Sequence, residues 1–76
     1  MNIDILKEAS VEYCENIYAL AINYLKKNNN VKLDSLVKEL VILEEDIRKC
    51  ENMELLNAYK MLLESLVSKI EGIINE

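Results

Sequence analysis

The residues of this chain that could support chemistry are two cysteines, Cys14 and Cys50, and carboxylates, of which the longest run is Glu44-Glu45-Asp46. The 76 residues include no histidine, so the side chain that most often acts as a general base near neutral pH is missing. Without it, no Ser/His or Cys/His nucleophile pair can form. Cys14 falls in the middle of an apolar stretch, where burial raises the pKa of a thiol and makes it unreactive. The sequence therefore predicts a protein that is not an enzyme.

The same residues do not form a pattern that would hold a cofactor or a metal ion. Consecutive helical residues project about 100° apart, so the side chains of Glu44, Glu45 and Asp46 cannot converge on one cation. Two isolated cysteines are too few for a zinc or iron–sulfur site. Gly72 is the only glycine, so there is no glycine-rich phosphate loop. We expect no cofactor and no metal.

The net charge of −5, from 14 acidic and 9 basic residues, bears on the class of partner. Because phosphate contacts dominate affinity for nucleic acids, an acidic surface argues against direct binding of DNA or RNA. The charge is compatible with a protein partner that has a basic surface, and also with plain solubility. The longest apolar runs, residues 18–22 and 40–43, are far shorter than the roughly 18 residues that indicate a membrane span. We therefore expect no membrane association, and the N-terminus lacks the pattern of a signal peptide.

The cysteines also indicate the compartment. If the first two helical stretches pair antiparallel about residues 28–32, Cys14 lies opposite a position near 46, about one turn from Cys50. A disulfide would then need the register of the two helices to slip. We expect two reduced cysteines acting as small apolar residues, which fits a reducing compartment, the cytoplasm.

Three amphipathic stretches must position any site, and the first covers residues 3–27. Its apolar residues fall on an arc roughly 200° wide, about twice what one neighbouring helix covers. We therefore expect this stretch to be the central helix, with its tyrosines packed in a core or an interface. Asn2 is its expected N-cap, and Asn28-Asn29-Asn30 interrupts the pattern. The arc consists of Ile3, Leu6, Val11, Tyr13, Cys14, Ile17, Tyr18, Leu20, Ala21, Ile22, Tyr24 and Leu25.

The second and third stretches, residues 34–50 and 53–75, carry narrower apolar stripes of about 100° and about 140°. Asp34 or Ser35 is the expected N-cap of the second stretch. With no proline and one glycine, the chain lacks the residues that interrupt helices, which favours long helices throughout.

The segment between residues 50 and 55 decides the architecture. Residues 31–71 contain neither glycine nor proline, so they could form one long helix. In a straight helix the apolar stripe would then shift by roughly 140° between positions 50 and 55, whereas a break near Glu51-Asn52 lets both stripes face the first helix. The sequence predicts one all-α domain, residues 1–76, folded as a small three-helix up-down-up bundle. The alternative is a helix plus one long continuous helix, completed by dimerisation.

One apolar residue of the second stretch falls outside its stripe. Ile42 lies on the far side from Leu40 and Ile47, near Glu45 and Asp46. Single exposed apolar residues are common, but an apolar residue rimmed by charge is also the layout of an interface anchor. Ile42, Glu45 and Asp46 are therefore candidates for contact with a partner.

Small residues repeat at three-four spacing along the back of the third stretch. Such a row is common on an exposed face, and it also lets another helix approach closely, so it is a candidate seam for self-association or for a partner. The row consists of Ala58, Met61, Ser65, Ser68 and Gly72.

The absence of a reactive group, together with more apolar helix surface than one small core needs, predicts a non-catalytic protein-binding module. The compact acidic format is typical of small regulators and inhibitors, such as immunity proteins or phage- and plasmid-borne inhibitors of host defence systems. The alternative is a structural subunit that assembles into a homo-oligomer, for example a homodimer, without a separate target.

Overall fold

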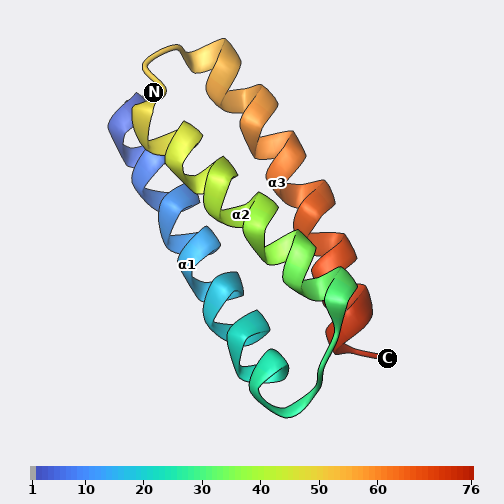
Figure 1. The fold of residues 1–76 in the computed structure, drawn as a ribbon. Coiled ribbons are helices and arrows are strands. Elements are labelled where there is room, and N and C mark those ends of the chain that lie inside the picture. The colour runs from blue at the N-terminus through green and yellow to red at the C-terminus, as the bar shows by residue number, and fades with distance from the viewer. Residues whose placement is uncertain (1) are drawn as a thin grey trace.

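The chain folds as three helices, α1 (Ile3–Lys27), α2 (Val31–Lys49) and α3 (Met53–Ile74), in a computed structural model that describes residues 2–76. Each helix runs antiparallel to the one before it, and short connections join them (Figure 1). Each helix packs against the other two, and the bundle measures 40 by 18 by 16 Å. The predicted three-helix bundle is therefore confirmed, and the alternative with one long continuous helix is wrong.

Asparagine side chains begin all three helices. The side-chain oxygen of the N-cap accepts a hydrogen bond from a backbone N–H of the first turn, which would otherwise lack a partner. The three N-caps and their donors are Asn2 with Asp4 (2.9 Å), Asn30 with Leu33 (2.8 Å) and Asn52 with Leu55 (3.0 Å).

The start of α2 differs from the prediction. The helix begins at Val31 instead of residue 34, because Asn30, and not the predicted Asp34 or Ser35, provides the cap. Asp34 instead lies in the first turn, where its carboxylate forms an ion pair with Lys38 at 3.3 Å. The connection between α1 and α2 is thus shorter than predicted, because Asn30, the last of the three asparagines, already caps α2.

The break between α2 and α3 lies where the shift of the apolar stripe predicts it. Cys50 leaves the helix with an extended backbone (φ −72°, ψ 133°), and its N–H bonds to the carbonyl of Ile47 at 3.2 Å. The Cys50 thiol donates to the carbonyl of Asn52 at 3.2 Å, across the connection. This connection turns the chain back, so that the buried stripes of α2 and α3 both face α1.

The core shows that α1 is not the central helix that its wide arc predicts. α2 and α3 each bury six apolar side chains, whereas α1 buries only Ser10, Cys14, Ile17 and Ala21, three of which are small. Small side chains let the two neighbours approach the middle of the arc closely. Its large outer residues, Tyr13, Tyr18 and Leu20, consequently remain exposed.

Both cysteines are buried and unbridged, as predicted. Within residues 2–76, no helix has the length and apolar character needed to cross a membrane.

Candidate protein-interaction site

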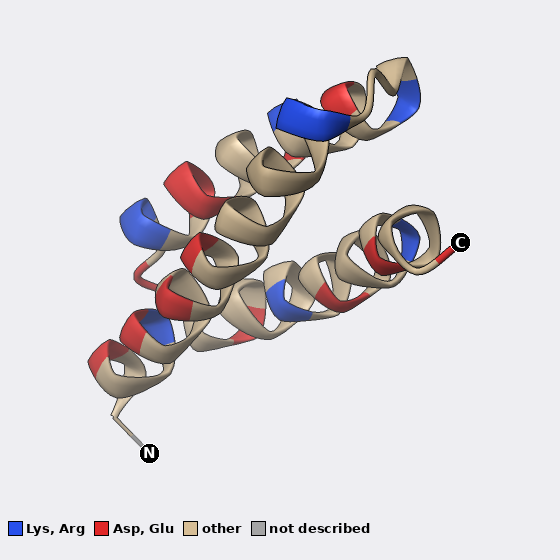
Figure 2. Cartoon of the chain, turned by 90° about the horizontal axis from the view of Figure 1, so that it is seen from below, with Lys and Arg blue, Asp and Glu red and all other residues tan. Residues whose placement is uncertain are grey.

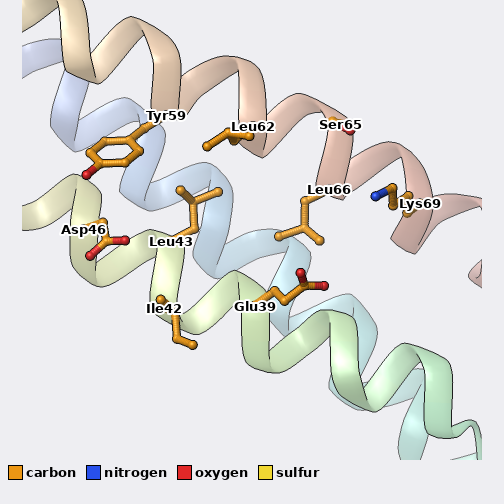
Figure 3. A pocket seen from close by; sticks show the side chains of 9 residues that line it. All are labelled: Glu39, Ile42, Leu43, Asp46, Tyr59, Leu62, Ser65, Leu66 and Lys69. Carbon is orange, nitrogen blue, oxygen red and sulfur yellow. The ribbon is translucent and has the colours of Figure 1, made fainter.

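An open groove of about 310 Å³ runs between the outer sides of α2 and α3. Figure 3 shows its side chains from close by. The lining residues are Glu39, Ile42, Leu43 and Asp46 from α2, and Tyr59, Leu62, Ser65, Leu66 and Lys69 from α3.

The floor of this groove is buried, but its apolar walls are not. Leu43 and Leu66 are each 8% exposed, whereas Ile42 is 63% exposed and Leu62 is 58% exposed. Ile42 and Leu43 differ because consecutive helical residues project about 100° apart, so only one of them can face the core. Burying a side chain of this size is worth about 1.5–3 kcal/mol, and Ile42 and Leu62 forgo most of that in the single chain.

Charged residues lie at the two ends of the groove. Asp46 lies near Tyr59 at one end, while Glu39 and Lys69 lie toward the other, and Ile42 and Leu62 lie between them (Figure 3). The ion pairs among residues 2–76 involve other groups: Lys38 with Asp34, Lys49 with Glu45, and Arg48 with Glu44 and Glu15. The charges of the groove are thus not used within the part of the chain that the structure describes.

The eight predicted partner-binding residues are all exposed. Ile42, Asp46 and Ser65 meet at the groove, so the anchor on α2 and one member of the row on α3, predicted separately, line the same groove. We call the surface formed by the residues of this groove the α2–α3 face. The other members of the row, Ala58, Met61, Ser68 and Gly72, lie outside the groove lining.

Two of the eight positions need separate comment. Glu45 does not line the groove and is paired with Lys49 at 3.5 Å, so it is not brought together with Ile42 and Asp46. A Cβ added at Gly72 would have no heavy atom within 4 Å apart from those of its two chain neighbours and of the surrounding helix backbone. Nothing in the single chain therefore requires a glycine there.

Six of the nine residues that line the groove were not among the predicted partner-binding positions, and two of these six, Leu43 and Leu66, form its buried floor. Tyr59 and Leu62 belong to the apolar arc of α3, whose spacing predicts residues packed in a core or an interface and does not single out a groove. Leu62 is exposed because it lies at the edge of the arc, which the neighbouring helices do not reach. Glu39 and Lys69 carried no signal beyond their charge, since only the packing of α2 against α3 brings them to one groove.

A second hollow, about 380 Å³, lies between α1 and α2. Its lining residues are Glu15 and Tyr18 from α1, and Val41 and Glu44 from α2. Tyr18 is 40% exposed and Val41 is 50% exposed. We call this surface the α1–α2 face; it combines apolar side chains with an acidic rim.

Carboxylates extend the acidic rim along α1. Figure 2 shows acidic positions recurring along the N-terminal half of the helix, and they are Asp4, Glu8, Glu12 and Glu15. Arg48 of α2 offsets part of this charge, with its Nη2 atom 3.0 Å from Glu44 Oε2 and 3.8 Å from Glu15 Oε1. The remaining carboxylates project into solvent and are available to a cationic surface.

The thiol of Cys14 lies in the core of the bundle. Cys14 is fully buried, and its pKa is raised from 9.0 to about 11 by burial, with a further contribution from the negative charge of Glu44. At neutral pH the thiol is therefore protonated and a poor nucleophile. Residues 2–76 contain no group of three or more side chains arranged to hold a metal ion.

A comparison of the chain with protein families, with curated proteins and with solved structures found no match.

Proposed function

We propose that this chain is a non-catalytic protein-binding module, a small acidic regulator or inhibitor of another protein. The observation that carries the proposal is the exposure of Tyr18 and Val41 on the α1–α2 face, outside a core that is already closed. Aromatic and aliphatic side chains surrounded by polar groups are typical anchors of protein interfaces.

A target with a basic surface fits this face best. Glu8, Glu12 and Glu15 extend from the hollow along α1, and the whole chain has a net charge of −5. An acidic surface attracts a basic partner over long range and speeds the encounter, and added salt weakens that attraction. One class of target is a protein whose basic surface normally holds nucleic acid. For that reason the proposal includes an inhibitor carried by a phage or plasmid, and an immunity protein. The two free thiols support a reducing compartment, the cytoplasm.

Differential capture with two neighbouring variants tests the proposal. Val41→Lys places a cation in the α1–α2 face, whereas Ile42→Lys makes the same change on the α2–α3 face. We expect a protein from the source cells to be retained by the wild type and by Ile42→Lys, lost with Val41→Lys, and released by salt. The captured protein is identified by mass spectrometry and must bind again when purified.

Two results would contradict this proposal. If no protein distinguishes Val41→Lys from the wild type, the α1–α2 face is not a binding site. If the target is lost with Ile42→Lys and kept with Val41→Lys, it binds the opposite side of α2.

A second candidate function is a self-assembling subunit without a separate target. It is supported by the apolar residues Tyr13 and Leu20, which remain exposed on another side of α1. Assembly beyond a dimer, measured as mass in solution at several dilutions, would favour this function, and a discrete small species would argue against it.

A further inference from the structure

We propose that the α2–α3 face binds a second copy of this chain, with α2 of each protomer lying antiparallel on α3 of the other. The inference is independent of the target proposed above, because that target uses the opposite side of α2. It rests on the order of residues along the groove, on their charges and on the size of the face.

The apolar centre of the groove suits a two-fold dimer. Ile42 and Leu62 lie at about the same level on opposite walls, with the buried side chain of Leu43 beneath them (Figure 3). In a two-fold interface, each contact between unlike residues occurs twice. A contact of Ile42 with the partner's Leu62 would therefore cover both exposed walls of both protomers.

Two arrangements bring this face against itself, and the charges distinguish them. If the two-fold axis runs along the groove, α2 lies on the partner's α3, and residues at the same level meet. Glu39 then approaches the partner's Lys69, and Asp46 approaches the hydroxyl of the partner's Tyr59. If the axis runs across the groove, α2 lies on the partner's α2, and Glu39 meets the partner's Asp46. Only the first arrangement joins opposite charges and gives the carboxylate of Asp46 a donor.

The reach of the side chains allows the charged contact. With a rise of about 1.5 Å per residue, Glu39 lies about 4.5 Å from the level of Ile42, and Lys69 lies about 10.5 Å from the level of Leu62. The offset between the two charges along the groove is therefore about 6 Å, which an extended lysine side chain can span. Neither Glu39 nor Lys69 forms an ion pair with another residue in the range 2–76. No existing ion pair must therefore be broken before the two residues meet across the interface.

The dimensions favour a full copy over a short peptide. The bundle is 40 Å long and 18 Å across at its widest, so any one side of it presents at most about 720 Å² in projection. A standard interface buries roughly 800 Å² per partner, so a stable complex on this side needs most of its length. A second copy aligned along the groove supplies that area and completes an antiparallel layer of four helices.

A charge exchange tests both the dimer and its geometry. By sedimentation at several concentrations, we expect the wild type to approach twice the 8.8 kDa of one chain. Glu39→Lys alone and Lys69→Glu alone should each raise the dimer dissociation constant about tenfold, since each places like charges together twice. The double variant, with both changes, should restore it to within a few-fold of the wild type.

Matched variants separate these effects from changes in folding or in net charge. Glu71→Lys alters the charge as Glu39→Lys does, but on a flank of α3 that does not line the groove, and it should leave the dissociation constant unchanged. Ile42→Lys should raise the constant about 100-fold, with the helical circular dichroism of the monomer retained.

Four results would overturn the inference. A wild-type monomer throughout the micromolar range would exclude the dimer, and a trimer or larger species would exclude the two-fold arrangement. A dimer tightened by Glu39→Lys would place α2 on the partner's α2. A dimer that survives Ile42→Lys would use another face, and none of these results would affect the test of target binding with Val41→Lys.

Discussion

Leu43 and Ile42 are consecutive residues of α2, but Leu43 lies in the core and Ile42 lies on the surface. Their alanine variants should therefore differ sharply in stability. Leu43 is 8% exposed on the floor of the groove, and it should lose about 2–3 kcal/mol in the free energy of unfolding when changed to alanine, near the lower end of the range for buried leucines. Ile42 is 63% exposed, so Ile42→Ala should change that free energy by less than about 0.5 kcal/mol. Alanine also favours the helix more than isoleucine does, which offsets part of any loss.

Such a difference is large for a chain of this length. A stability of about 0.05–0.15 kcal/mol per residue gives 76 residues roughly 4–11 kcal/mol in total. Leu43→Ala should therefore lower the melting temperature by about 10–20 °C, at about 4–8 °C for each kcal/mol.

The assay is urea unfolding followed by circular dichroism, with both variants at one protein concentration below that at which the wild type self-associates. The concentration matters because a dimer adds its own binding free energy to the apparent stability. Equal losses for Leu43→Ala and Ile42→Ala would show that Ile42 is a core residue and would refute the assignment of the α2–α3 face.

Three further predictions concern a thiol, a helix cap and a glycine. The folded-state pKa of Cys14, about 11, lies above its ordinary value of 9.0, so its contribution to stability should be complete below pH 9 and should be lost as the pH rises through 11. The loss in the free energy of unfolding reaches at most about 2.7 kcal/mol. It is measured at each pH as the difference between the wild type and Cys14→Ala, because this difference cancels the titration of other groups. A difference that stays constant with pH would contradict the prediction. Asn52→Ala removes the bond to the N–H of Leu55 and should cost about 1 kcal/mol in urea unfolding, while Asn52→Asp should not; a stabilised alanine variant would argue against the break at this position. Gly72→Ala should raise stability by about 0.5–1 kcal/mol, because the added methyl group meets no atom of another element, and a loss of stability in the monomer would contradict the open space at this position.

The helices and the break between α2 and α3 were predictable because local rules decide them. Asn2 begins α1 by bonding a backbone N–H of the first turn, as its position in the sequence indicates. The shift of the apolar stripe between residues 50 and 55 favoured a turn, because one straight helix would face two ways and would need a second chain to cover it. The start of α2 was missed because Asn30, Asp34 and Ser35 are all competent caps, and the residue that serves depends on the path of the chain from α1.

The grooves were less predictable because they depend on how closely the helices approach one another. The wide apolar arc of α1 indicated a central helix, yet Cys14 and Ala21 let both neighbours pack at its middle and leave Tyr18 outside. The sequence indicated Ile42 as a surface residue, which the structure bears out, but it gave no means of pairing Ile42 with Leu62 on another helix.

Titration of the identified target against three proteins tests the proposed function most directly. By calorimetry, we expect the wild type and Ile42→Lys to bind the target with the same dissociation constant per chain, and Val41→Lys to bind at least tenfold more weakly. Val41 and Ile42 are neighbours on one helix, so the comparison holds helix propensity and net charge nearly constant. Equal dissociation constants for all three proteins would contradict binding through the α1–α2 face.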